Sequence, residues 1–442
     1  MKLPSIKGFD EDAFNKYLKN TGLLMLGRVG SLIIKMVTSI QVANYLLKYN
    51  NGILNTSVAY VFFFASVATL GLDSFIVKEL HQYPEKRDKI LGTAFFLKAF
   101  AGLMCVPAIF LTWQIIPLTY TPYQIILVLS FTGLMQSLTV VDAYFQSQVQ
   151  SKYIMQVQII GNLISAGVKL SLIYFFSAGL IYFAYALLFD VFLLSAGYFL
   201  VYHRKDRDIF SWKFEKSLAT RLLKLSWPLI VSGIMVSIYM RIDTIMLKEI
   251  LKDAGTEAAG AYATVVMYSE ALNFVPVAIV SSLFPAILNA RRDDPIRYQK
   301  RLQNLFDLMV WLSVLFAIFI SLASPLIYSI LQPSFADAAP VLAIHVWGSI
   351  FVFLGVASSQ FLIAEGYIKL TFIRTGLGAI VNILLNFILI PRMGMMGTAI
   401  ATVIAYFSAT FLILFIPKTR TQGIMMLKSL FLISLFQKLA KR

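Results

Sequence analysis

The sequence predicts an all-α polytopic membrane protein whose twelve transmembrane helices form two six-helix lobes. Its mean hydropathy is +0.77, and 59% of its residues are apolar while 14% are charged. Soluble domains contain about 45–50% apolar and about 25% charged residues, so the composition excludes that class. Apolar runs of bilayer-spanning length recur along the chain, and one long polar connection divides them into halves.

The predicted helices cover residues 18–47, 55–80, 91–113, 122–147, 155–177, 179–202, 222–250, 260–290, 305–331, 338–363, 370–391 and 394–417. Almost nothing polar separates the fifth helix from the sixth. Their combined run of about 45 residues is too long for one crossing, which predicts a break near 177–180.

Basic residues predict the orientation of these helices. They concentrate in alternate loops, and the opposite loops hold only Lys48, Lys248, Lys252 and Arg392. By the positive-inside rule, both termini are therefore cytoplasmic. The formal net charge of +16 follows from this topology. We expect no nucleic-acid partner, because no basic arm or base-reading module is present.

The polar connection after the sixth helix defines the predicted domains. We expect a cytoplasmic amino terminus (1–17), an N-lobe (18–202), a cytoplasmic linker (203–221), a C-lobe (222–417) and a cytoplasmic amphipathic tail (418–442). Six spans per half give both lobes the same orientation. If the lobes are repeats, a pseudo-two-fold axis runs along the membrane normal and a substrate site lies between them.

The first predicted helix carries two cations, Arg28 and Lys35. A spacing of seven residues places them on one helix face, about 10 Å apart along the axis. Snorkelling to the headgroups explains Arg28, which lies in the first half of the span. It explains Lys35 poorly, because this residue is near the middle. We therefore expect this face to line a hydrophilic cavity.

Further ionisable residues occur within predicted spans, where they commonly mark function. The cations expected to line a substrate cavity are Arg28, Lys35, Lys98, Lys169, Arg241 and Arg374. The acids are candidates for ion coupling: Asp142, Asp190, Asp243 and Glu270. Because cations outnumber acids, such a cavity suits an anion, and arginine binds phosphate well.

The alternative is that these charges form internal pairs that hold helices together. Arg241 with Glu270 and Lys169 with Asp142 are examples. Asp73, near the inner end of the second span, is expected to cap that helix or to pair with Lys78. We expect His345 to be structural or interfacial.

Motifs of catalysis are missing from the sequence. No metal-ligand spacing, glycine-rich phosphate loop, Walker motif or nucleophile constellation is present. We therefore expect no enzyme activity, no cofactor and no catalytic or metal site. The short outer loops also count against a membrane glycosyltransferase.

Several segments resemble one membrane-protein family. They are Asn20-Thr21-Gly22, Thr69-Leu70-Gly71-Leu72-Asp73-Ser74, Val141-Asp142-Ala143-Tyr144-Phe145-Gln146, Trp227-Pro228-Leu229, Arg241-Ile242-Asp243, Leu283-Phe284-Pro285-Ala286 and Ile363-Ala364-Glu365-Gly366. In this order they resemble the polysaccharide-transporter family of O-antigen and teichuronic-type flippases. That family belongs to the multidrug/oligosaccharidyl-lipid/polysaccharide exporter superfamily. Ala143 departs from the pattern, where an aromatic residue is common.

The resemblance implies a flippase in the bacterial inner (plasma) membrane. It would move undecaprenyl-pyrophosphate-linked oligosaccharide repeat units of an O-antigen or capsule type to the outer leaflet by alternating access. The implied partners are this polyprenyl-linked oligosaccharide, the lipid bilayer, protons or sodium, and polysaccharide polymerase and chain-length proteins. The alternatives are a cation-coupled multidrug exporter, a membrane glycosyltransferase, and a scaffold of polysaccharide assembly.

Overall fold

The computed structural model describes residues 11–148, 150–204, 210–431 and 433–434. The chain divides into two compact units, each described by itself below. The first unit contains Met1–Tyr45 and Tyr60–Ile234, and the second contains Leu46–Ala59 and Met235–Arg442. Within the described residues, the secondary structure is entirely helical, as the sequence predicts.

Ten described stretches are long and apolar enough to cross a membrane, and two of them hold two crossings each. The helix α1 (Glu11–Ala68) has 58 residues, and a continuous helix of that length would extend about 87 Å. A kink at Leu47, with φ 58° and ψ 178°, separates its two crossings. The stretch Lys216–Phe284 likewise holds α9 (Lys216–Leu251) together with α10 (Gly255–Ser269) and most of α11 (Phe274–Asp293). The twelve predicted crossings are therefore present.

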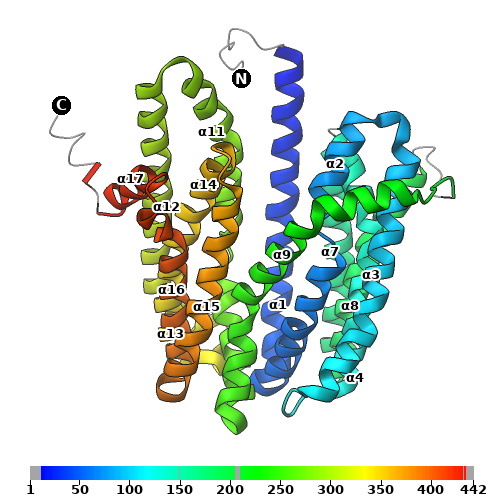
Figure 1. Ribbon diagram of the computed structural model, residues 1–442. Helices are drawn as coiled ribbons and strands as arrows, with labels where there is room; N and C mark the ends of the chain where they lie inside the picture. Colours follow the sequence, from blue (N-terminus) through cyan, green and yellow to red (C-terminus); the bar gives the residue numbers. More distant parts are fainter. Residues whose placement is uncertain (1–10, 149, 205–209, 432, 435–442) are drawn as a thin grey trace. The chain divides into compact units, whose positions relative to one another are not determined.

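The first unit contains the short helices α2 (Asp73–Gln82) and η1 (Pro84–Lys86) and the long helix α3 (Arg87–Ile115). The fourth crossing consists of α4 (Tyr123–Ser130), α5 (Thr132–Met135), η2 (Gln136–Thr139) and α6 (Val140–Ser147). It is followed by α7 (Ser151–Tyr174) and α8 (Leu180–His203), which pack along each other (Figure 1). The break between α7 and α8 is at Ser177, with φ 44°, as predicted.

The predicted second span, 55–80, is not one helix. It ends at Ala68, and α2 begins at Asp73, after Leu70 and Gly71 in the left-handed region. Gly71 is required here, because a Cβ at this position would lie 2.6 Å from Leu229 Cβ. The break has a functional consequence, since it directs Asp73 toward α3.

The second unit contains η3 (Lys252–Ala254), α10, α11 and α12 (Pro295–Leu331). It continues with η4 (Pro333–Ala338), α13 (Ala339–His345), η5 (Val346–Gly348) and α14 (Ser349–Ala364). The last helices are α15 (Ile368–Met393), α16 (Met395–Phe411), η6 (Leu412–Phe415) and α17 (Arg420–Leu430). The predicted span 260–290 is interrupted at residues 270–273, so α10 and α11 form this crossing together.

Each unit has its own apolar core. In the first unit, Leu72, Leu91, Val140 and Tyr202 are fully buried together. In the second, Phe306, Met309, Leu354 and Ile413 form the equivalent cluster. Helix α17 joins this second core through Met426, and Ser429 donates to Asp307 of α12 at 2.6 Å.

Candidate functional site

Three charged side chains from three helices form a group in the first unit. Lys169 of α7 pairs with Asp190 of α8, whose other carboxylate oxygen accepts a hydrogen bond from Ser165. Lys35 of α1 interacts electrostatically with both Lys169 and Asp190. Two cations face one acid, so the group has a positive net charge. We call Lys35, Lys169 and Asp190 the α1–α7–α8 charge group.

The expected pair between Lys169 and Asp142 is wrong. Asp142 lies on α6 and accepts a hydrogen bond from Gln146, one turn further along the same helix, at 3.0 Å. The close packing of α7 along α8 brings Asp190 to Lys169 instead. Sequence distance does not reveal which acid a neighbouring helix presents.

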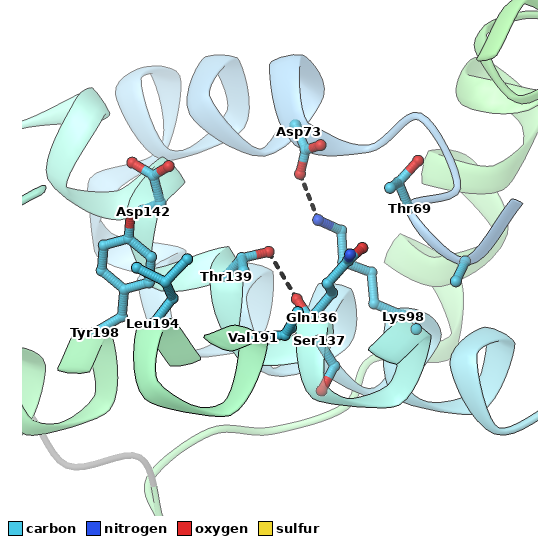
Figure 2. Close-up of a pocket in the computed structure, with 12 residues that line it drawn as sticks. Thr69, Asp73, Lys98, Gln136, Ser137, Thr139, Asp142, Val191, Leu194 and Tyr198 are labelled. Atoms are coloured by element: carbon cyan, nitrogen blue, oxygen red, sulfur yellow. Dashed lines mark hydrogen bonds and ion pairs between the residues drawn. The ribbon is translucent and has the colours of Figure 1, made fainter. Parts of the chain in front are cut away.

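A second charged site in the first unit surrounds Lys98. This side chain is only 3% exposed, and its ammonium pairs with Asp73 at the start of α2 (Figure 2). The expected pair between Asp73 and Lys78 is therefore wrong. The break at residues 69–72 restarts the helix in a direction that sequence spacing alone does not indicate.

Lys98 and Asp73 line a pocket of about 280 Å³. Its other polar lining residues are Thr69, Gln136, Ser137, Thr139, Asp142 and Tyr198. Figure 2 shows Asp142 and Tyr198 at one end of this pocket, Thr69 and Lys98 at the other, and Asp73 between them. With two carboxylates, one ammonium and several hydroxyl and amide groups, the pocket can form hydrogen bonds with a hydroxylated ligand.

In the second unit, Asp243 of α9 is the centre of a buried polar network. It is 5% exposed, and one carboxylate oxygen accepts from Asn386 of α15 at 2.6 Å. The other accepts from Thr402 of α16 at 2.6 Å and from Tyr262 of α10 at 3.1 Å. Asn386 also donates to Asn382 at 3.2 Å. The hydrogen-bond donors to this carboxylate are all neutral.

The partners of Asp243 were not identified from the sequence. Asn382 and Asn386 are four residues apart and so share a helix face, which is the only signal that the sequence contains for them. Uncharged residues do not stand out in an apolar span as Asp243 does. Their oxygen atoms and the carboxylate form the donor set that Na⁺ and other hard cations prefer.

Arg241 and Glu270 lie close enough for an electrostatic interaction, and their pairing stays a prediction. Glu270 is the C-cap residue of α10, and the break at residues 270–273 begins with it. His345 is 4% exposed, and its ring packs edge-on against Tyr262 with centroids 5.7 Å apart. This packing is that of a core residue, as we expected for His345.

Two expected site cations remain. Arg374 of α15 is 7% exposed and donates to Gly355 and Ser359 of α14. Arg28 lies in α1, and its side chain is outside the described part of the chain. The structure therefore places Lys35 and Lys169 in one group, Lys98 in a second, and Arg241 and Arg374 in the other unit.

The fold is shared with transporters of the MOP superfamily. A multidrug resistance MATE family transporter in an inward-facing conformation aligns with a TM-score of 0.74, at 14% identity, over 90% of this chain and 96% of that chain. The lipid II flippase MurJ in an inward closed conformation aligns with a TM-score of 0.68, at 17% identity, over 94% of this chain and 92% of that chain. A MOP superfamily transporter from Pyrococcus furiosus aligns with a TM-score of 0.63, at 14% identity, over 94% of this chain and 96% of that chain.

The sequence defines the family more narrowly than the fold does. Residues 17–291, more than half of the chain, match the family described as polysaccharide biosynthesis protein. The chain belongs to this family. It is a multi-pass membrane protein with the fold of the MOP transporters and flippases. The chain matches no curated protein sequence.

Proposed function

We propose that this protein is a flippase for undecaprenyl-pyrophosphate-linked oligosaccharide repeat units of an O-antigen or capsule type. It moves them from the cytoplasmic to the outer leaflet of the bacterial inner membrane by alternating access. Membership of the polysaccharide biosynthesis family supports the glycan, and the fold shared with a lipid II flippase supports the lipid-linked form. Polysaccharide polymerase and chain-length proteins are the expected partners.

The α1–α7–α8 charge group is the observation on which the proposal mainly depends. A diphosphate head needs positive charge to replace its hydration as it crosses hydrocarbon. Lys35 is the cation of this group that forms no ion pair of its own among the described residues, since Asp190 pairs with Lys169. It is also exposed on α1. We therefore assign Lys35 the main substrate contact in the first unit, with Arg28 and Lys98 as further cations of that unit. Arg241 and Arg374 are the proposed substrate-binding cations of the second unit.

Reconstituted transport tests this function. Purified protein in vesicles should move a fluorescent polyprenyl-diphosphate oligosaccharide, and Lys35→Gln should abolish this movement while the protein still inserts and purifies. Lys300→Gln, which alters an exposed cation of α12, is the matched control and should retain full activity. Equal transport by wild type and Lys35→Gln removes Lys35 from the site, and the absence of any transport contradicts the proposed function.

We further propose that Asp243 is the ion-coupling carboxylate, ahead of Asp142, Asp190 and Glu270. Asp190 is paired with Lys169, and Glu270 lies in the field of Arg241. Asp243 instead accepts hydrogen bonds from neutral groups, so a proton or Na⁺ can add to it without displacing a salt bridge. Asp243→Asn should make transport independent of an imposed proton or sodium gradient. Wild-type transport that ignores both gradients contradicts the coupling.

A multidrug exporter of the same superfamily is the second candidate, because a MATE family transporter shares the fold. A cavity for cationic drugs requires a net negative charge, whereas the α1–α7–α8 charge group is net positive. Extrusion of a cationic dye that survives Lys35→Gln and fails in Asp190→Asn would favour that candidate. If the protein were a glycosyltransferase, the purified protein alone would transfer sugar to an acceptor.

A further inference from the structure

Arg374 differs from the other buried cations in its partners. Its Nη2 donates to the carbonyl oxygen of Gly355 at 3.0 Å and to the hydroxyl of Ser359 at 2.6 Å. Its Nη1 is buried and has no hydrogen-bond partner among the described residues. Lys98 and Lys169 each pair with an aspartate, but none of the ion pairs among the described residues includes Arg374.

A buried charge without a counter-ion is strongly unfavourable, because the lost hydration is not replaced. The neutral contacts of Nη2 offset part of this cost and hold the guanidinium in place. They leave Nη1 with its donors unused. An arginine positioned in this way fits an anionic ligand that enters from outside the unit's own side chains.

Arg374 lines a pocket of about 190 Å³ formed by α9, α14, α15 and α16. Typical pockets for drug-sized ligands have about 300–1,000 Å³, so this one suits a single small group. Tyr239 also lines it and lies close enough to Arg374 for an electrostatic interaction. The absence of a Cβ at Gly378 makes room for the Tyr239 ring, since a Cβ there would lie 2.6 Å from Tyr239 Cε2.

The donors available to a ligand come from two side chains. The hydroxyls of Ser359, Thr375 and Thr410 donate to helix carbonyl groups. The hydroxyl of Tyr239 has no hydrogen-bond partner among the described residues, so it can donate together with Arg374 Nη1. A guanidinium and a phenol are both donors that match the oxygens of a phosphate group.

We propose that this pocket of the second unit binds one phosphate group, with Arg374 as its charged ligand and Tyr239 as its second donor. The proposal rests on the proposed function only for the source of that group. The phosphate belongs either to the diphosphate head of the lipid-linked substrate or to free inorganic phosphate. A prenyl diphosphate that binds more tightly than inorganic phosphate identifies the first source, and equal affinities identify the second.

The test uses the purified full chain in nanodiscs, with inorganic phosphate and geranyl diphosphate as probes in calorimetric titration and thermal unfolding. Wild type should bind at least one probe and unfold at a higher temperature with it. Arg374→Met should weaken this binding at least about tenfold, the loss expected for a charge-assisted hydrogen bond. Its unfolding temperature without ligand should stay equal or rise, because an uncompensated buried charge is removed.

Arg392→Met is the matched control, because it alters an exposed arginine on the same helix and should change neither measurement. Arg374→Lys keeps the charge and should retain weakened binding, which tests the site even if Arg374→Met does not fold. Wild type that binds neither probe, or Arg374→Met that binds like wild type, overturns the proposal. Transport of lipid-linked saccharide with no phosphate binding at Arg374 refutes this inference alone. Binding that depends on Arg374, without transport, refutes the proposed function alone.

Discussion

The carboxylate of Asp190 has a partner at each oxygen: Lys169 pairs with one, and Ser165 donates a hydrogen bond to the other. The side chains of Lys169 and Asp190 are 14% and 23% exposed, so water replaces these contacts only in part. Such a pair restricts how α7 and α8 slide past each other. Its contribution is therefore best measured by removing one partner and then both.

We predict that Asp190→Asn destabilises the protein by about 1–3 kcal/mol, because Lys169 keeps its charge and loses its acceptor. The double variant Lys169→Met/Asp190→Leu should unfold at a temperature closer to wild type, since it removes both charges together. Thermal unfolding of the purified variants measures this. A double variant whose loss of stability equals the sum of the losses in Lys169→Met and Asp190→Leu, each measured alone, shows that the residues act independently.

At the scale of elements, the second unit depends on a close helix crossing near the start of α10. A Cβ on Gly52 would lie 1.8 Å from the Thr256 carbonyl oxygen, and one on Gly260 would lie 2.0 Å from the Lys48 carbonyl oxygen. Asn51 donates to the Gly260 carbonyl oxygen at 2.8 Å. The backbones meet here directly, so glycine is required for space rather than for its φ angle.

Gly52→Ala and Gly260→Ala should each destabilise the second unit by at least about 3 kcal/mol, the upper end of ordinary overpacking, because a backbone carbonyl cannot move aside as a side chain can. Monodispersity and unfolding temperature after purification measure the effect. Gly167→Ala in α7 is the control, since its Cβ meets nothing within 4 Å. It should be neutral or more stable by about 0.5–1 kcal/mol. A tolerated Gly52→Ala would contradict the direct crossing.

The segment before α9 is the other element with a testable contact. The amide of Glu215 donates to Thr93 Oγ1 at 3.0 Å, and Trp212 packs against Phe95 and Tyr202. The carboxylate of Glu215 pairs with Lys89 at 2.9 Å. Hydrogen bonds from Lys89 and then from Ser217 hold the pKa of Glu215 below its ordinary value.

A lowered carboxyl pKa means that the contact stabilises the folded state above the ordinary glutamate pKa of about 4.3 and is lost as pH falls through the lower folded value. Hydrogen exchange at the Glu215 amide, corrected for intrinsic rates, should therefore accelerate in that acidic range. Glu215→Gln should remove this acid step and leave the exchange of the α7 amides unchanged. If the acceleration of exchange at acidic pH persists in Glu215→Gln, another titrating group causes it.

At the scale of the whole molecule, orientation in the membrane follows from charge distribution. Residues 291–301, around the junction of α11 and α12, and the segment before α9 carry many cations, and the opposite loops carry few. Cys105 is the only cysteine of the sequence and is buried, with its thiol donating to the Phe64 carbonyl oxygen at 3.2 Å. A Cys105→Ser background is therefore a suitable starting point for placing single accessible cysteines.

In that background, an impermeant maleimide added to intact cells should label Glu257→Cys, and it should label Lys300→Cys only after permeabilisation. Both native side chains are exposed, so burial does not limit the reaction. The reason is that the Lys300 side of the membrane carries the excess of basic residues. Labelling in the opposite order would reverse the proposed cytoplasmic location of the termini.

The sequence by itself determined that the chain is helical and crosses the membrane twelve times. The reason is that hydrocarbon admits only apolar segments whose backbone N–H and C=O groups are hydrogen-bonded within the segment. It also singled out Lys35, Lys169, Asp190 and Asp243, since a charge is conspicuous in an apolar run. Their partners were decided by the tertiary structure. The hydrogen bonds to Asp243 come from three other helices, α10, α15 and α16, and no local sequence pattern shows which residues those helices bring together.

Helix breaks were likewise decided by the fold. The turn at Leu70 and Gly71 and the interruption at residues 270–273 occur inside predicted spans that are long enough to cross the bilayer without a break. Hydropathy measures transfer into lipid and contains no term for a backbone that changes direction against a neighbouring helix. For that reason the sequence offered Asp73 a capping role or a pair with Lys78, whereas the structure pairs it with Lys98. The pocket around Arg374 could not be predicted from hydropathy for the same reason, because it forms only where α14 and α15 pack together.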